Sequence, residues 1–211
     1  MTPPISSIGK KLIMAVTGIM LSLFIIIHTI GNTSALFGRA AYNHYAETLH
    51  RLGFLLQISE GLLLLALLLH IYYGLKLALE NHQARDTGYR GKRRRLSSIP
   101  GWAMPYTGAL ILFFIGFHYY QLHRPGGMTE TALKVRTILT ITPSALFYLL
   151  AIAALTLHTV HGFWSLNQTL GINYPQYNPL IKGVSLVAAL AVGIGLMLLP
   201  ILALFTADFL L

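Results

Sequence analysis

The sequence has no cysteine among its 211 residues. Disulfides, thiolate-bound zinc, iron–sulfur clusters and covalently attached c-type haem all require cysteine, so the sequence excludes each of them. A redox centre in this chain would therefore be held non-covalently, and it would rest on histidine, of which there are 9.

Charged residues are also scarce, and acidic ones especially so. Only 10% of the residues are charged, with 6 Asp or Glu against 15 Lys or Arg, while 55% are hydrophobic. About a quarter of the residues of an ordinary soluble domain are charged, so this composition predicts an integral membrane protein. The basic residues behind the net charge of +9 cluster between apolar runs, as membrane topology requires, and leave no soluble basic domain for nucleic acid.

Five apolar runs divide the chain, at about 9–32, 53–80, 102–122, 142–168 and 178–206. At 1.5 Å per residue, about 20 residues cross a hydrocarbon core of roughly 30 Å, so each run is predicted to be a transmembrane helix. The first run is too long for the apolar part of a signal peptide, and no cleavage pattern follows it. We therefore predict an all-α fold, in which residues 1–211 form a single integral membrane bundle of five transmembrane helices.

Lysine and arginine are distributed unequally between the two sides of this predicted bundle. One side holds ten of them: Lys10, Lys11, Lys76, Arg85, Arg90, Lys92, Arg93, Arg94, Arg95 and Lys182. The other side holds five: Arg39, Arg51, Arg124, Lys134 and Arg136. The positive-inside rule then predicts a cytoplasmic N-terminus and a C-terminus outside.

Four of the apolar runs contain a histidine well inside them: His28, His70, His118 and His158. An ionisable side chain in hydrocarbon is costly and normally faces the protein interior, where it has a function. Neutral imidazole is the usual axial ligand of a buried haem iron, and a six-coordinate haem needs two, so four histidines would hold two haems in a helix bundle. The alternative, in which a histidine only hydrogen-bonds a neighbouring carbonyl, stays open for each of them.

Depth along the helices arranges these histidines in two pairs. His28 lies near the outer end of the first run, and His118 lies 16 residues after Trp102, in the outer half of the third. His70 and His158 are reached only after some 17 and 15 residues of the descending second and fourth runs. We therefore predict an outer haem held by His28 and His118 and an inner haem held by His70 and His158.

Local spacing repeats this pairing. Thr17-Gly18 precedes His28 in the pattern T-G-x9-H, and Thr107-Gly108 precedes His118 in the same pattern. The two inner candidates share H-x3-G, in which a glycine one turn from the ligand would let a porphyrin edge approach the backbone. His161, one turn after His158, does not fit this pattern and is interpreted as a packing or hydrogen-bonding group.

At this level of detail the chain resembles a known family. The stretches that carry the resemblance are SSIGKKLIMAVTG followed by His28 and Gly31-Asn32, LLLHIYYGLKLALEN-x-x-AR around His70, Trp102 ahead of T-G-x9-H, and LHTVHGFWSLNQTLG. They are similar to the cytochrome b membrane-anchor subunit of succinate dehydrogenase and quinol:fumarate reductase, in its single-chain, five-helix, dihaem form. In that family the first and third helices hold one haem, the second and fourth hold the other, and the fourth-helix ligand precedes a glycine by four residues, which points to His158.

The resemblance implies a subunit of a succinate:quinone oxidoreductase that has no dicarboxylate site of its own. It would sit in the bacterial cytoplasmic membrane, bind two haem b groups, anchor the flavoprotein and iron–sulfur subunits on the cytoplasmic side and exchange electrons with menaquinone or another quinone. Trp102 would hydrogen-bond a propionate of the inner haem, and segment 83–98 would lie against the iron–sulfur subunit. Some members carry a glutamate of a proton path two residues before the fourth-helix ligand; Thr156 stands there in this chain. The resemblance does not indicate whether the reaction runs as in the tricarboxylic acid cycle or as in fumarate respiration. It also leaves open whether the complex forms a higher oligomer.

Quinone chemistry needs protons as well as electrons, so its site requires titratable groups at a wet face next to a haem. Glu60 is the candidate, because it lies about seven residues into the second run from the outer side and a membrane-embedded carboxylate is expensive unless it functions. His44 and His50 in the adjoining connection could relay protons. The alternative is that Glu60 only pairs with Arg51, Ser59 or water.

Two other functions are compatible with parts of this pattern. A cytochrome b anchor of another respiratory dehydrogenase, such as a hydrogenase or formate dehydrogenase, would also use paired histidines, although with different ligand spacing. A haem-free transporter or structural bundle would explain the apolarity and the charge, but it would leave the two histidine signatures as coincidence.

Overall fold

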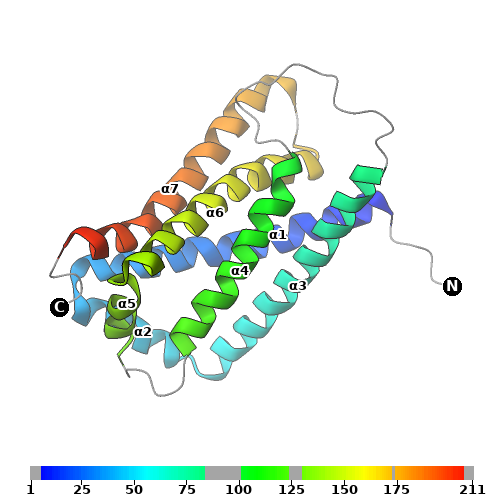
Figure 1. Cartoon of the computed structure of the whole chain (residues 1–211). Helices are drawn as coiled ribbons and strands as arrows, with labels where there is room; N and C mark the ends of the chain where they lie inside the picture. Colours follow the sequence, from blue (N-terminus) through cyan, green and yellow to red (C-terminus); the bar gives the residue numbers. More distant parts are fainter. Residues whose placement is uncertain (1–5, 84–100, 124–129, 173, 207–211) are drawn as a thin grey trace.

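The computed structural model describes residues 6–83, 101–123, 130–172 and 174–206, and helices dominate these residues, with no strand among them. Five long helices form the bundle in Figure 1: α1 (Ser7–Thr33), α3 (Phe54–Gln83), α4 (Met104–His123), α6 (Thr142–Thr169) and α7 (Asn178–Phe205). The all-α prediction is therefore confirmed. Three single-turn 3₁₀ helices lie between them, η1 (Ser34–Phe37), η2 (Gly101–Ala103) and η3 (Pro175–Tyr177).

Four segments are long and apolar enough to cross a membrane: Ser7–Phe37, Phe54–Gln83, Thr142–Thr169 and Pro175–Phe205. Their leucine, isoleucine and phenylalanine side chains are largely exposed on the outside of the bundle, where lipid would cover them. These features support the prediction of a membrane protein. The expected third span corresponds to α4, which is not among the four.

Two pairs of neighbouring helices, α1 with α3 and α4 with α6, make up the part of the bundle that carries the histidines, and α7 packs against α6 and α1. Small residues bring α7 close to its neighbours. A Cβ added to Gly193 would overlap the side chain of Thr156 on α6, and one added to Gly195 would lie 2.6 Å from Thr29 Cγ2 on α1. These two glycines are therefore positions of close helix packing.

Two short helices, α2 (Arg39–His50) and α5 (Thr131–Leu139), cover one end of the bundle, which we call the α2 end. Neither helix is among those predicted from the sequence. Asn43 joins them, since its Oδ1 accepts a hydrogen bond from the Ala132 backbone N–H at 3.0 Å, in the first turn of α5. Arg39 forms an ion pair with Glu130, the residue before α5. The buried apolar core is also concentrated at this end, around Tyr42, Ala132, Leu139, Tyr148 and Leu199.

The opposite end, which we call the Lys10 end, is fastened by an ion pair. Lys10 on α1 is only 7% exposed, and its Nζ contacts both carboxylate oxygens of Glu80 on α3. Ser6 caps α1 there by accepting a hydrogen bond from the Gly9 N–H at 3.1 Å. Segment 83–98, which is predicted to lie against the iron–sulfur subunit, is outside the described residues except for Gln83.

Candidate functional site

The four membrane histidines meet in two pairs inside the bundle. The ring centroids of His28 on α1 and His118 on α4 are 6.1 Å apart, with the ring planes nearly perpendicular at 89°. Those of His70 on α3 and His158 on α6 are 6.3 Å apart, at 59°. The structure therefore brings together the rings that depth along the sequence pairs.

These separations match what two axial ligands of one iron require. A metal–imidazole bond is about 2 Å long and the ring centre lies about 1 Å beyond the nitrogen, so two rings on opposite sides of one iron have centres about 6 Å apart. Each of the four rings is partly buried. Both pairs therefore fit a bis-histidine haem by separation and donor type, although iron ligation itself stays a prediction.

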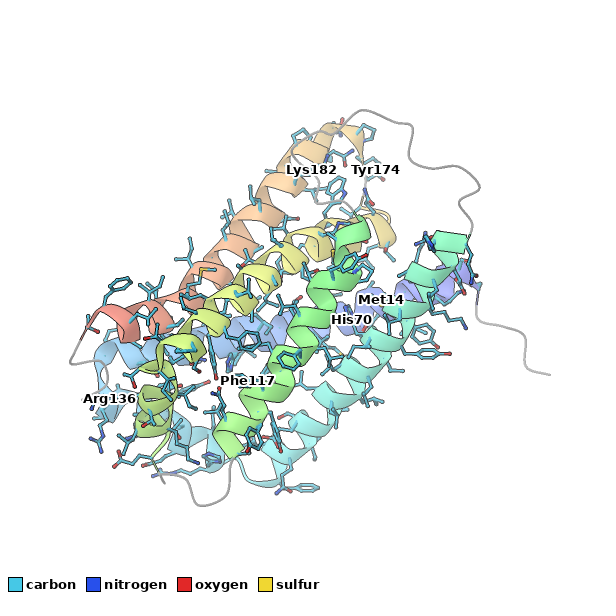
Figure 2. The ribbon with its side chains drawn as sticks, in the orientation of Figure 1. Met14, His70, Phe117, Arg136, Tyr174 and Lys182 are labelled. Carbon is cyan, nitrogen blue, oxygen red and sulfur yellow. The ribbon has the colours of Figure 1, made fainter. Side chains whose placement is uncertain are left out.

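Threonine hydroxyls contact the Nδ1 atom of both rings in the His70–His158 pair. Thr17 Oγ1 on α1 lies 3.2 Å from His70 Nδ1, and Thr107 Oγ1 on α4 lies 3.0 Å from His158 Nδ1. Figure 2 shows His70 next to Met14, one turn before Thr17 on α1. Each ring is thus contacted by a threonine hydroxyl of the neighbouring helix.

His118 is held differently, by a chain of buried side chains at the α2 end. Its Nδ1 lies 3.0 Å from the Tyr148 hydroxyl, which donates a hydrogen bond to Gln121 Oε1 at 3.0 Å. The Gln121 amide then donates to Ser144 Oγ at 3.3 Å. The sequence analysis does not identify Tyr148, because no local pattern links it to a histidine on another helix.

His28 makes different contacts from His118. Its ring stacks on Phe24 with centroids 5.4 Å apart, and its backbone carbonyl accepts a hydrogen bond from the Asn32 amide at 2.8 Å. Asn32 Oδ1 in turn accepts from the Tyr42 hydroxyl at 3.1 Å. Burial, together with the nearby Tyr45, raises the pKa of Tyr42 to about 12, so its hydroxyl stays a hydrogen-bond donor at physiological pH.

The contacts reveal an internal repeat of two helix pairs. Thr17, Phe24 and His28 on α1 recur 90 positions later on α4, and the two copies run in the same direction, since their threonines and their histidines meet at matching levels. The second helices repeat at 88 positions, as ALxLHxxxG in 66–74 and 154–162. In this register Glu60 occupies the position of Tyr148, each being ten residues before its inner histidine.

The structure changes the interpretation of the two glycine signatures. The T-G pair precedes an outer histidine in sequence, but a Cβ added to Gly18 or Gly108 would lie 3.5 Å from the Cε1 of His70 or His158, respectively. Thr17-Gly18 and Thr107-Gly108 therefore serve the second pair of histidines in space. The glycine of H-x3-G does not lie against a histidine ring, since a Cβ at Gly74 would meet Met14 and one at Gly162 would meet nothing within 4 Å, and the approach of a porphyrin edge to it stays a prediction.

The other candidate residues do not gather at the histidines. Glu60, His44 and His50 are exposed, on α3 and α2, and in the described part of the chain no hydrogen bond or ion pair joins Glu60 to Arg51, Ser59 or a histidine. The Ser59 hydroxyl instead donates to the Leu56 carbonyl at 2.7 Å.

Three further residues complete the comparison with the sequence analysis. The ring of His161 lies near Gly101, where an added Cβ would be 3.9 Å from its Cε1. Thr156 faces α7 rather than the histidines, and its hydroxyl donates to the Ile152 carbonyl at 2.8 Å. The side chain of Trp102 lies outside the described residues.

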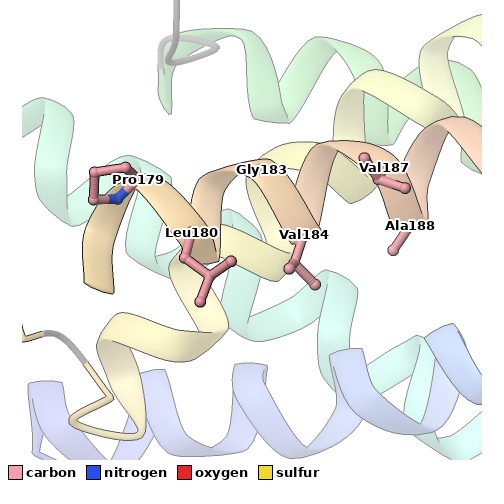
Figure 3. A pocket seen from close by; sticks show the side chains of 6 residues that line it. All are labelled: Pro179, Leu180, Gly183, Val184, Val187 and Ala188. Atoms are coloured by element: carbon pink, nitrogen blue, oxygen red, sulfur yellow. The ribbon is translucent and has the colours of Figure 1, made fainter. Parts of the chain in front are cut away.

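A shallow hollow of about 490 Å³ lies on α7 near the Lys10 end (Figure 3). Its lining is apolar: Pro179, Leu180, Gly183, Val184, Val187 and Ala188. Because none of these side chains can bind a metal or move a proton, this hollow fits a lipid-facing surface and the histidine pairs remain the candidate site.

Comparison of the chain with protein-family models, with curated proteins and with solved structures finds no match. The chemistry of the histidine pairs, together with the resemblance of the sequence, therefore carries the functional proposal.

Proposed function

We propose that this chain is the dihaem cytochrome b anchor of a succinate:quinone oxidoreductase and passes electrons between an iron–sulfur subunit and a membrane quinone. The observation that carries the proposal is the presence of two pairs of histidine rings at ligand separation, each ring on a different helix of an apolar bundle. A haem-free transporter gives no reason for four imidazoles to meet in pairs at two levels.

In this proposal α4 crosses the membrane in addition to the four segments named above, and the Lys10 end faces the cytoplasm. The 20 residues of α4 reach about 30 Å at 1.5 Å per residue, enough for the hydrocarbon core. It lies beside α6 in the bundle, so its polar groups need not face lipid (Figure 1). Five spans place the N-terminus in the cytoplasm and the C-terminus outside, in the bacterial cytoplasmic membrane.

The two histidine pairs would hold haems at different levels of the bundle. His70 and His158 would hold the inner haem, and His28 and His118 the outer one. When bound, the haems supply one-electron transfer between the two faces of the membrane. The flavoprotein and iron–sulfur subunits would dock at the Lys10 end, and the quinone would react at the α2 end.

Glu60 remains our candidate for the quinone site. It aligns with Tyr148 in the internal repeat, so it stands near the level of the outer pair, but unlike Tyr148 it is exposed. Its neighbours Leu62 and Leu64 are 51% and 57% exposed, so the carboxyl group lies on a surface that a lipid-soluble molecule can reach. A quinone arriving through the bilayer would find there a group able to exchange protons.

Haem content tests the proposal directly. The purified full-length chain is expected to carry two low-spin b haems, seen as an α band after dithionite reduction and quantified as pyridine haemochrome. Replacing His28 or His118 by Ala should remove one haem and replacing His70 or His158 the other, because one imidazole leaves the low-spin site incomplete.

The matched control is His161→Ala, which removes a histidine from the same helix and should keep both haems. Absence of haem from the wild-type chain would refute the dihaem proposal. Two haems without a co-purifying flavoprotein from the native membrane would favour the anchor of another dehydrogenase.

A further inference from the structure

We propose that Thr17 and Thr107 are positioning residues that fix the tautomer and orientation of His70 and His158, so that both rings present Nε2 to one iron. This inference rests on the proposed dihaem function and adds to it the groups that tune the inner haem.

Counting protons around each threonine fixes the direction of its bond to histidine. A hydroxyl has one proton. The Ile13 carbonyl, at 2.8 Å, is the closest acceptor for the Thr17 proton, so we assign the proton to it and the oxygen accepts at His70 Nδ1. In this assignment Nδ1 carries the hydrogen, which leaves the lone pair of the neutral ring on Nε2.

The same count holds for the second copy of the repeat. Thr107 Oγ1 lies 3.1 Å from the Ala103 carbonyl and 3.0 Å from His158 Nδ1, and by the same assignment its proton goes to the carbonyl and its oxygen accepts from the ring. The assignment then gives both rings the same tautomer. Metal-bound histidines almost always donate their second ring N–H to such an acceptor.

The glycine after each threonine lets the ring lie against the neighbouring helix. A Cβ at Gly18 or Gly108 would lie in ordinary contact with the ring, 3.5 Å away, so a side chain that extends beyond Cβ would occupy the place of the imidazole. The T-G dipeptide therefore combines an acceptor with the space for the ring that it holds.

An acceptor at Nδ1–H makes Nε2 a stronger electron donor. Stronger donation stabilises ferric over ferrous iron, so loss of the hydroxyl should raise the midpoint potential of the inner haem. It should also weaken retention of that haem, on the order of 10- to 100-fold, since second-shell partners of metal-bound histidine typically have effects of this size. The outer haem should be unaffected, because His118 is held by Tyr148 instead.

Valine and serine variants separate positioning from packing. Thr17→Val and Thr107→Val keep the shape of the side chain but remove the acceptor, and Thr17→Ser and Thr107→Ser restore it. The matched control is Thr29→Val, because Thr29 also lies on α1, is 8% exposed and donates to a carbonyl four residues earlier at 2.7 Å, with no histidine partner.

Redox titration and electron paramagnetic resonance of the purified full-length chain give the readout. Each valine variant is expected to raise the potential and shift the low-spin signal of the haem that His70→Ala removes. Both serine variants and Thr29→Val should resemble the wild type.

A wild-type chain with two haems whose potential and signal are unchanged in both valine variants would overturn the inference and leave the dihaem function standing. A wild-type chain without haem would overturn both. If one valine variant does not accumulate, the other carries the test alone, since each threonine acts on its own ring.

Discussion

Tyr148 contacts the outer pair directly, because its hydroxyl lies within hydrogen-bond distance of His118 Nδ1. Its hydroxyl proton goes to Gln121, so the hydroxyl oxygen accepts from His118 and produces the same tautomer there as threonine does at the inner pair. Tyr148 is only 9% exposed, and its partners His118 and Gln121 are partly buried. One buried hydroxyl thus supports a fold contact and a ligand at once.

We predict that Tyr148→Phe destabilises the chain by about 1–3 kcal/mol, because it removes the hydrogen-bond partner of two partly buried groups, His118 Nδ1 and Gln121 Oε1. The same variant should change the potential of the outer haem and leave the inner one as it is. Thermal unfolding in detergent and redox titration measure the two effects. Tyr120→Phe is the control, since Tyr120 is 62% exposed on α4, and equal effects from both variants would contradict the prediction.

Tyr42 gives a prediction for alkaline pH. Burial, with a smaller contribution from Tyr45, raises its pKa from 10.0 to about 12 in the folded chain. The unfolded chain therefore loses this proton first as pH rises, so the stability that Tyr42 contributes is present below pH 10 and is lost between pH 10 and about 12. Two pKa units correspond to about 2–3 kcal/mol.

Comparing thermal unfolding of the wild type and Tyr42→Phe from pH 9 to 12 tests this. The difference between the two should shrink across that range. A constant difference would show that Tyr42 has an ordinary pKa.

At the scale of elements, α2 and α5 support each other across a long sequence separation. Asn43 accepts from the first turn of α5 and its amide also lies 3.3 Å from Glu130 Oε2. Asn43→Ala should cost about 1 kcal/mol, as loss of a cap does, and should speed hydrogen exchange in α5. The exposed Arg39–Glu130 pair should matter less, so Arg39→Gln serves as the control. If Arg39→Gln speeds exchange in α5 and Asn43→Ala does not, the prediction is wrong and the ion pair matters more than the contacts of Asn43.

The same elements show what the sequence can and cannot predict. The long apolar helices follow from length and composition, which dominate folding in a membrane, and the depth of each histidine follows from counting residues along them. The helices α2 and α5 do not, because they are short and polar and their contacts come from residues about 90 positions apart. For the same reason the contact between Thr17 and His70, 53 positions apart, is not visible in T-G-x9-H, although the repeat of that pattern hints at a shared role.

At the scale of the whole molecule, the two histidine pairs lie at successive levels between the Lys10 end and the α2 end. If succinate is oxidised at the cytoplasmic Lys10 end and quinone is reduced near Glu60, electrons cross the membrane toward the positive side. A full crossing is favoured by about 2.3 kcal/mol per charge per 100 mV. Quinone reduction by succinate in sealed vesicles should therefore slow when the potential is collapsed.

We predict that Glu60→Gln abolishes quinone turnover while both haems and dye reduction by succinate are retained. Glutamine keeps the size of the side chain but cannot exchange the proton that a quinone needs. Glu47→Gln, which changes an exposed carboxylate on α2, is the control. Unchanged quinone activity in Glu60→Gln would place the site elsewhere, and the cytoplasmic end near Trp102 would be the next candidate.

The internal repeat has an evolutionary consequence. Each histidine pair takes one ring from each copy of the repeat, so a single helix pair provides one ring of each pair and completes neither. An ancestral chain of one helix pair would have completed the two ring pairs only as a homodimer, with both pairs on its two-fold axis and identical residues on either side. Gene duplication and fusion would have released the two halves from that identity. Glu60 and Tyr148 would then mark one ancestral position, which is an exposed carboxylate in one half and a buried tyrosine in the other.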